Sequence, residues 1–387
     1  MKKLIVLSVV FALVASTAAF AVDLGATIIG SASLASGESG DGASEDIVGS
    51  GGLGRVRIDG GGEAGEGKFG GYFRYDGGAT GNAWWKPIDQ FKLLIGGNGG
   101  DGFFAKEGVT GWMFYQEPCD IGVSNNGNTW GGGYGTMKFR DIFYGGGFDG
   151  NPDVLLMITP LDILAINVQL PFITGKGMKT EDIFKVALFQ LDLKLDFGNI
   201  ALTYKGGLND IDTSGGFSGY GGDYSSPQIY LYYGGSFGDL AIDFGFTYHM
   251  DAENTAGDKV KRPMGVGLGV KYAADSFGVK FRAGATLAGE DKNTNIIADI
   301  MPYFSLGDNI TAFVSVGIGM FMPDEGDQLM GWHFNPYVQI GEEWGAKFVI
   351  GVKLWNQTAQ NDASTNWANV KDDLIHWEIP IGVKVSF

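Results

Sequence analysis

Apolar and polar residues alternate with a period of two along much of the chain. The last segment shows this best, because one face is wholly apolar while the other is small or charged. The apolar face holds Trp377, Ile379, Ile381, Val383, Val385 and Phe387, and the other face holds His376, Glu378, Pro380, Gly382, Lys384 and Ser386. A period of two is typical of a β-strand with two unlike faces.

The same alternation recurs in segments 189–197, 240–249, 277–285 and 346–354. In a soluble sandwich the apolar face would form the core. In a membrane barrel it would meet lipid, and the polar face would line the lumen. The alternation alone does not separate these two structures.

The connections between these segments alternate between short and long. Short turns rich in Gly, Asn and Asp include 197–199, 237–239 and 307–309, whereas 209–225 and 357–373 are long and polar. Outer-membrane barrels have short periplasmic turns and longer external loops. The connections therefore favour the barrel.

Eighteen strands can be placed along the chain. They are 22–34, 51–59, 67–76, 82–86, 90–97, 153–159, 163–173, 182–196, 199–208, 226–236, 240–250, 263–273, 277–288, 295–306, 310–322, 332–341, 344–356 and 374–387. The segments 51–59, 82–86 and 153–159 are the weakest, which leaves 16 strands as the alternative. The predicted fold class is all-β: a closed antiparallel transmembrane β-barrel of 16–18 strands, with 18 preferred.

The N-terminus has the order of a secretory signal peptide. Lys2 and Lys3 precede an apolar run, and Ala19-Phe20-Ala21 forms an A-x-A cleavage site. We expect residues 1–21 to be removed after export through the Sec pathway. Residues 22–387 would then form a single barrel domain.

Composition agrees with export into a membrane. Charged residues make up only 18% of the chain, and 66 of the 387 residues are Gly. Removing Lys2 and Lys3 takes the formal charge from −17 to −19, which argues against a nucleic-acid partner. Cys119 is the single cysteine, so no intramolecular disulfide can form, and we expect no role for it.

Aromatic residues sit where an interfacial girdle would lie. Trp377 and Phe387 share a face ten residues apart, which for a tilted strand is roughly 25 Å along the membrane normal. Phe197, Phe237, Phe277 and Trp344 lie beside short turns. The alternative is that aromatic residues simply favour strands.

The signal peptide, the amphipathic hairpins and the ending Val383-Lys384-Val385-Ser386-Phe387 together resemble bacterial outer-membrane porins. The resemblance covers the mature chain as architecture. It implies an integral outer-membrane protein whose final Phe387 is read by the barrel-assembly machinery. It also implies contacts with outer-membrane lipid and with small hydrophilic solutes or ions. Porins are commonly trimers, but this sequence leaves a homo-oligomer open.

The longest irregular stretch is 98–149, which is rich in Gly and aromatic residues. A loop of this length usually has a function or structure of its own. We expect it to fold into the barrel and narrow it, with an external loop or an extra hairpin as alternatives. The candidate constriction residues are Asp101, Lys106, Glu107, Trp112, Tyr115, Trp130, Lys138 and Arg140.

Charged residues on the polar faces of the strands are the candidates for the pore lining. They are Asp192, Lys194, Asp196, Lys205, Asp243, Lys271, Lys280, Arg282, Lys347, Lys353, Glu378 and Lys384. Rings of charge set ion preference in pores. The alternative is that most of these charges are only solvated and select nothing.

The function favoured by these features is passive diffusion of small hydrophilic solutes and ions through a water-filled barrel. The alternative is a surface adhesin or structural barrel that binds host or neighbouring molecules through its acidic loops. We expect no enzyme, because no G-x-S-x-G or H-E-x-x-H motif occurs. We also expect no catalytic residue, cofactor or bound metal. The acidic Asp324-Glu325-Gly326-Asp327 does not match a calcium-loop spacing.

Overall fold

The structure is a computed structural model of the whole chain. It describes residues 22–40, 47–75, 78–96, 153–171, 182–185, 187–206, 227–250, 252–253, 259–260, 264–287, 294–341, 345–356 and 375–386. The statements below concern these residues.

One antiparallel sheet contains all the long strands and closes on itself. Its strands are β1 (Val22–Ser39), β2 (Ile47–Ala64), β3 (Phe69–Tyr75), β4 (Ala79–Ile88), β5 (Phe91–Gly96), β6 (Asp153–Leu161), β7 (Leu164–Pro171), β8 (Leu188–Leu195), β9 (Gly198–Lys205), β10 (Gln228–Phe237), β11 (Leu240–His249), β14 (Met264–Ala273), β15 (Phe277–Leu287), β16 (Thr294–Gly307), β17 (Ile310–Met322), β18 (Leu329–Gly341), β19 (Ala346–Gly351), β20 (Lys353–Trp355) and β21 (Ile375–Ser386). Three further elements of the described residues lie outside this sheet: the paired two-residue strands β12 (Ala252–Glu253) and β13 (Lys259–Val260), and the short helix α3 (Asp182–Lys185).

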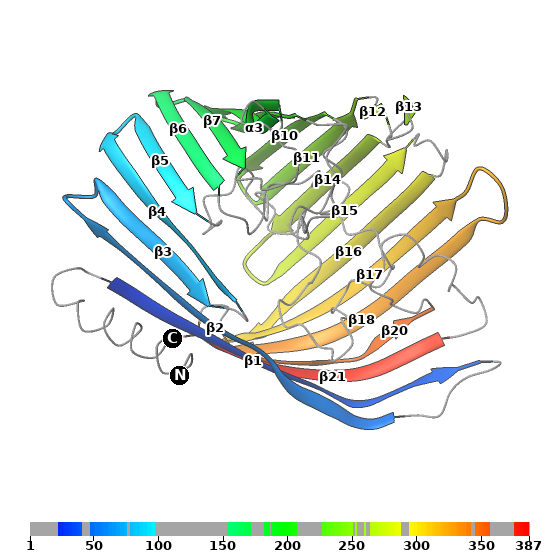
Figure 1. The fold of residues 1–387 in the computed structure, drawn as a ribbon. Coiled ribbons are helices and arrows are strands. Elements are labelled where there is room, and N and C mark those ends of the chain that lie inside the picture. The colour runs from blue at the N-terminus through cyan, green and yellow to red at the C-terminus, as the bar shows by residue number, and fades with distance from the viewer. Residues whose placement is uncertain are drawn as a thin grey trace, which may run out of the picture.

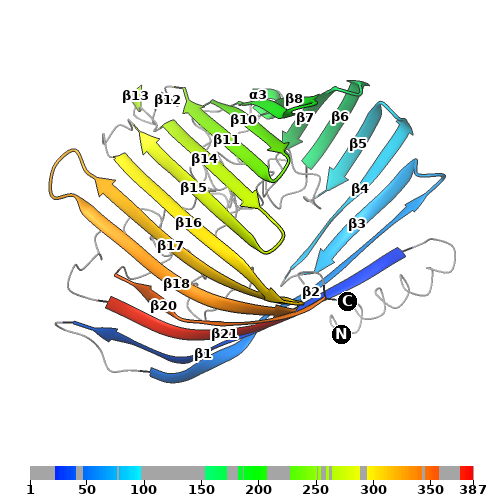
Figure 2. The ribbon, with the colours of Figure 1, turned by 180° about the vertical axis from the view of Figure 1, so that it is seen from behind.

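Closure depends on the first and last strands. β1 pairs with β2 along one edge and with β21 along the other, so neither terminal strand leaves an open edge. Thr27 lies opposite Ser386, and their hydroxyl oxygens are 3.3 Å apart. Figures 1 and 2 show the strands following one another around the wall, with the blue first strand beside the red last one.

β19 and β20 are two parts of one strand. Both pair with β18 on one side and β21 on the other, so the wall has 18 strands. Pro336 of β18 lies beside the break and accepts a 2.9 Å hydrogen bond from the Val352 amide. Proline has no N–H to donate in return, so the ladder is interrupted there.

The two faces of the wall differ in polarity. Large apolar side chains are exposed on one face, as at Phe73, Leu191, Val316 and Ile350. The residues that alternate with them on the same strands are polar and often buried, for example Gln190 beside Leu191. In a closed barrel the first face is the outside, which suits lipid, and the second face is the inside.

The predicted fold class is confirmed, and the strand count is 18 rather than 16. The three weak segments 51–59, 82–86 and 153–159 lie in β2, β4 and β6. Several boundary predictions were wrong: β1 ends at Ser39 and not at 34, and β2 extends beyond 51–59 to Ile47 and Ala64. The largest error is in the strand expected to begin at residue 182, which begins at Leu188, after α3. The alternation that defines this strand begins only at Leu188, whereas Asp182–Lys185 has no period of two.

Candidate pore wall and lumen pocket

Several predicted pore-lining residues form hydrogen bonds along the inner wall. Asp192 of β8 accepts bonds of 2.5 Å from both Asn167 and Gln190. Asp243 of β11 is fully buried and accepts a 2.7 Å bond from the Tyr232 hydroxyl. The acids on this part of the wall are therefore held in place by amide and phenol donors.

Arg282 belongs to a buried network across four strands, β15 to β18. Its Nε lies 2.6 Å from Oδ2 of Asp299, and both side chains are at most 4% exposed. The Nε2 atom of His333 is 3.9 Å from Oδ1 of Asp299 and 3.0 Å from the Ser315 hydroxyl. Asp299 was not among the predicted residues, although Ala298, Asp299 and Ile300 continue the alternation of β16.

The structure brings other candidates together in cross-strand pairs. Lys271 lies opposite Lys280, Lys347 opposite Lys384, and Lys353 opposite Glu378. Each pair is on neighbouring strands of the inner wall. Two of the three pairs therefore place like charges side by side.

The remaining candidates are spread along β8 and β9. Lys205 is buried near the end of β9, whereas Lys194 is exposed near the end of β8. Asp196 is exposed in the turn that follows Leu195 and so lies just beyond the strand. These three residues do not form one cluster with the charges of β14 to β21.

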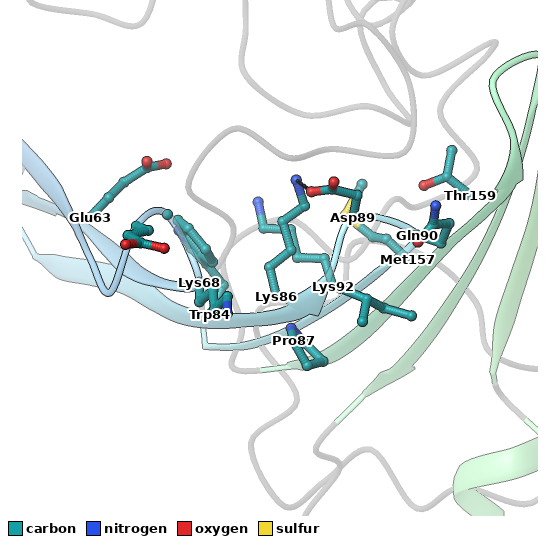
Figure 3. A pocket seen from close by; sticks show the side chains of 13 residues that line it. Glu63, Lys68, Trp84, Lys86, Pro87, Asp89, Gln90, Lys92, Met157 and Thr159 are labelled. Atoms are coloured by element: carbon teal, nitrogen blue, oxygen red, sulfur yellow. Dashed lines mark ion pairs between the residues drawn. The ribbon is translucent and has the colours of Figure 1, made fainter.

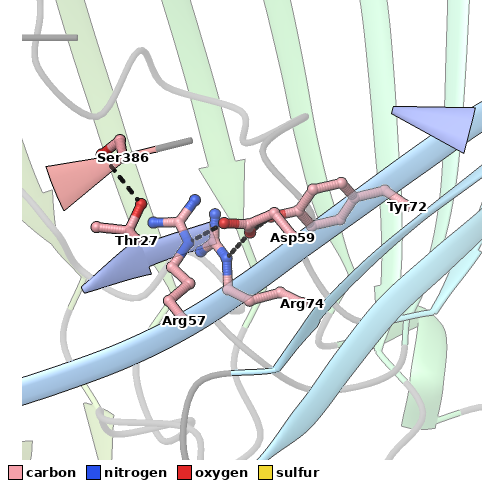
Figure 4. A network of polar contacts seen from close by, with 6 residues as sticks. All are labelled: Thr27, Arg57, Asp59, Tyr72, Arg74 and Ser386. Atoms are coloured by element: carbon pink, nitrogen blue, oxygen red, sulfur yellow. Dashed lines mark hydrogen bonds and ion pairs between the residues drawn. The ribbon is translucent and has the colours of Figure 1, made fainter. Parts of the chain in front are cut away.

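A charged cluster on β2 and β3 was missed by the sequence reasoning. Asp59 accepts hydrogen bonds from Arg57, Arg74 and the hydroxyl of Tyr72, and the Arg74 Nε is 2.8 Å from its Oδ1 (Figure 4). Arg74 also lies over the Tyr72 ring, 5.6 Å from its centroid. The signal was present in the alternation of Arg57 and Asp59 with Val56 and Ile58.

A pocket of about 800 Å³ opens at the short-turn end of strands β2 to β6. Six charged side chains line it together with Trp84, Gln90, Met157, Thr159 and the backbone of two turns. The charged residues are Glu63, Glu66, Lys68, Lys86, Asp89 and Lys92. Figure 3 shows Glu63 at one side of the pocket, separated from Lys86 and Lys92 by the indole of Trp84.

Two contacts fix the cations of this pocket. The Nζ atom of Lys86 is 3.0 Å from Oδ1 of Asp89, and this ion pair is drawn in Figure 3. The Nζ atom of Lys92 lies over the ring of Trp84, 4.9 Å from its centroid. A cation–π contact of this kind helps to hold an ammonium group over the ring.

The constriction candidates Asp101, Lys106, Glu107, Trp112, Tyr115, Trp130, Lys138 and Arg140 lie outside the described residues, as do Cys119, Trp344 and Phe387. Phe197 and Phe237, two of the expected girdle residues, are exposed beside short turns.

Within the described ranges, no three His, Cys, Asp or Glu residues are grouped so that they could hold a metal ion. No helix in the described part of the chain is long and apolar enough to cross a membrane.

Comparison with solved structures identifies the architecture. The anion-selective porin from Comamonas acidovorans aligns with a TM-score of 0.53 and 11% identity, over 95% of this chain and 100% of that one. The fold is that of a bacterial outer-membrane porin. A closed barrel of this kind spans the outer membrane with its apolar band facing lipid. The fold is therefore that of an integral protein of the bacterial outer membrane.

Two other outer-membrane channels also align. OccK5 (OpdH) of Pseudomonas aeruginosa has a TM-score of 0.49 and 9% identity, over 94% of this chain and 98% of that one. The channel DcaP of Acinetobacter baumannii has a TM-score of 0.49 and 10% identity, over 96% and 98%. No protein-family model and no curated protein matches the sequence.

Proposed function

We propose that this chain is a porin that lets small hydrophilic solutes and ions diffuse passively across the outer membrane. The observation that carries the proposal is the contrast between the two faces of a closed 18-strand wall. Apolar side chains such as Val316 and Ile350 point outward, while charged residues such as Asp192 and Arg282 alternate inward. Barrels of 16–18 strands are wide enough to enclose an aqueous channel.

The finer parts of the proposal rest on sequence. Residues 1–21 would be the cleaved signal peptide, 22–387 the barrel domain, and 98–149 the segment that narrows the lumen. The pore-lining charges would set ion preference. Phe387 would be read by the barrel-assembly machinery, and outer-membrane lipid would surround the wall.

The geometry of the described histidines supports a non-enzymatic function. Ser315, His333 and Asp299 have the residue types of a hydrolytic triad, but the contacts of His333 with Ser315 and with Asp299 use the same ring nitrogen, Nε2. A triad needs the acid on the other nitrogen, so that the base is oriented while it faces the serine. All three side chains are also buried, which keeps a substrate away from Ser315. His376 instead contacts Glu38 at 3.2 Å and stacks on Trp355.

Single-channel conductance of the refolded mature protein in a planar bilayer tests the proposal. Stable open steps are expected, and a salt gradient across the bilayer gives the ion preference from the reversal potential. Correct folding is checked first by the shift in gel mobility on heating. A folded barrel that gives no conductance would overturn the proposal and favour the adhesin alternative.

A further inference from the structure

We propose that the pocket at the short-turn end of β2–β6 is a subsite for zwitterionic solutes, such as short peptides with a free amino and a free carboxyl end. The proposal rests on the channel function proposed above for its physiological meaning. The binding itself does not depend on conductance. The pocket residues are Glu63, Glu66, Lys68, Trp84, Lys86, Asp89, Lys92 and Met157, together with the adjoining turns.

Charges of both signs line the pocket in equal number. Three carboxylates, those of Glu63, Glu66 and Asp89, stand with three ammonium groups, those of Lys68, Lys86 and Lys92. A simple anion would meet the carboxylates as well as the ammonium groups, and a simple cation would meet the same mixture. A solute with both charges gains from both sets.

Glu63 and Lys92 lie on different sides of the pocket (Figure 3). The carboxylate of Glu63 lies next to the β2–β3 turn, where its Oε2 would be 3.5 Å from a Cβ on Gly67. Lys92 is on β5 and is held over Trp84 on β4, so the indole stands between the acid and the ammonium (Figure 3). The two ends of an extended dipeptide are roughly 7 Å apart, which suits charges on opposite sides of a pocket rather than adjacent ones.

The size of the pocket and the rest of its lining suit a small solute. A volume of about 800 Å³ is within the usual range of small-molecule sites. Met157 supplies an adaptable apolar surface, and Gln90 and Thr159 supply polar groups beside it. The pocket therefore offers a place for a small side chain between the two charged ends.

The test uses three probes of nearly equal size. Glycylleucine carries both charges, N-acetyl-glycylleucine carries only the carboxylate, and glycylleucinamide carries only the ammonium. Their affinities for the folded mature protein in detergent are measured by titration calorimetry. We expect the zwitterion to bind at least about threefold more tightly than either blocked form, the size of effect that one partly solvated ion pair gives.

Two variants separate the two charged contacts. Glu63→Gln should remove the advantage of glycylleucine over its N-acetyl form, while its advantage over the amide remains. Lys92→Gln should remove the advantage of glycylleucine over the amide, while its advantage over the N-acetyl form remains. Asp308→Asn, in the exposed β16–β17 turn, and Lys185→Gln, exposed on α3, are the matched controls and should change none of the three affinities.

The outcomes distinguish this proposal from the channel function. Equal affinities for the three probes would overturn the subsite even if the protein conducts. The same loss of affinity in Asp308→Asn or Lys185→Gln would also overturn it. Selective binding by a folded protein that does not conduct would support the subsite and overturn the channel. Conduction that glycylleucine interrupts in the wild type but not in Lys92→Gln would support both.

Discussion

The indole ring of Trp84 lies across the backbone of Gly70, its cross-strand partner. A Cβ on Gly70 would stand 2.3 Å from Cζ2 of that ring, which is closer than real side chains approach. The indole also lies beneath the ammonium of Lys92. The absence of a side chain at residue 70 therefore sets where Trp84, and through it Lys92, stands in the lumen pocket.

We predict that Gly70→Ala moves Trp84 and weakens the subsite. Inserting a methyl group into this contact should destabilise the barrel by about 1–3 kcal/mol, the usual cost of overpacking. The affinity for glycylleucine should fall at the same time. The midpoint of the heat-induced gel shift measures the first effect, and calorimetry measures the second.

Gly30→Ala is the matched control, because nothing lies within 4 Å of a Cβ at Gly30. It should leave both measurements unchanged. If Gly70→Ala behaves like Gly30→Ala, the ring of Trp84 is free to move and does not position Lys92.

The same arrangement explains part of the high glycine content. Phe73 lies over Gly60 and Tyr303 over Gly278, and both are cross-strand pairs. The alternation of apolar and polar residues, together with the succession of short and long connections, was sufficient to predict 18 strands and the closed fold. It could not show which glycine lies under which aromatic ring, because this depends on the register between strands and not on the order within one.

The candidate site was predicted only in part for the same reason. Asp243 and Arg282 could be placed on the inner face from alternation alone, but their partners Tyr232 and Asp299 come from neighbouring strands. The pocket was missed altogether, because it joins turn residues such as Asp89 to side chains of four different strands. Periodicity within a strand carries no information on such groupings.

We predict that Asp299→Asn is strongly destabilising. It leaves the guanidinium of Arg282, which is 4% exposed, without its carboxylate partner. Breaking a buried ion pair costs about 3–5 kcal/mol. Asp89→Asn removes a partner of Lys86 that is 91% exposed, so it should cost less than about 1 kcal/mol. Chemical unfolding in micelles compares the two, and equal losses would mean that the Arg282 network contributes no more than a surface pair.

We predict that Asp59→Asn shifts the ion preference of the pore toward anions. Arg57 and Arg74 share this single carboxylate, and its neutralisation leaves two guanidinium groups on the same stretch of inner wall. The reversal potential in a salt gradient should move accordingly, while Asp308→Asn should not move it. The shift should be larger at 0.1 M than at 1 M salt, because screening lengths fall from about 10 Å to about 3 Å. A shift that does not depend on salt would point to a change of pore shape instead.

Arginine substitutions at two depths on one strand test which face of the wall meets lipid. Val316 lies in the middle of β17 and is 37% exposed on the apolar face, while Ile310 begins the same strand on the same face, beside the short turn. Arginine on the lipid face costs about 2–4 kcal/mol at the bilayer midplane and about 0–1 kcal/mol near the interface. Val316→Arg should therefore reduce folding into lipid vesicles, measured by equilibrium denaturation, far more than Ile310→Arg. If the two variants fold equally well, this face does not meet the hydrocarbon core, and the assignment of the inner and outer faces is reversed.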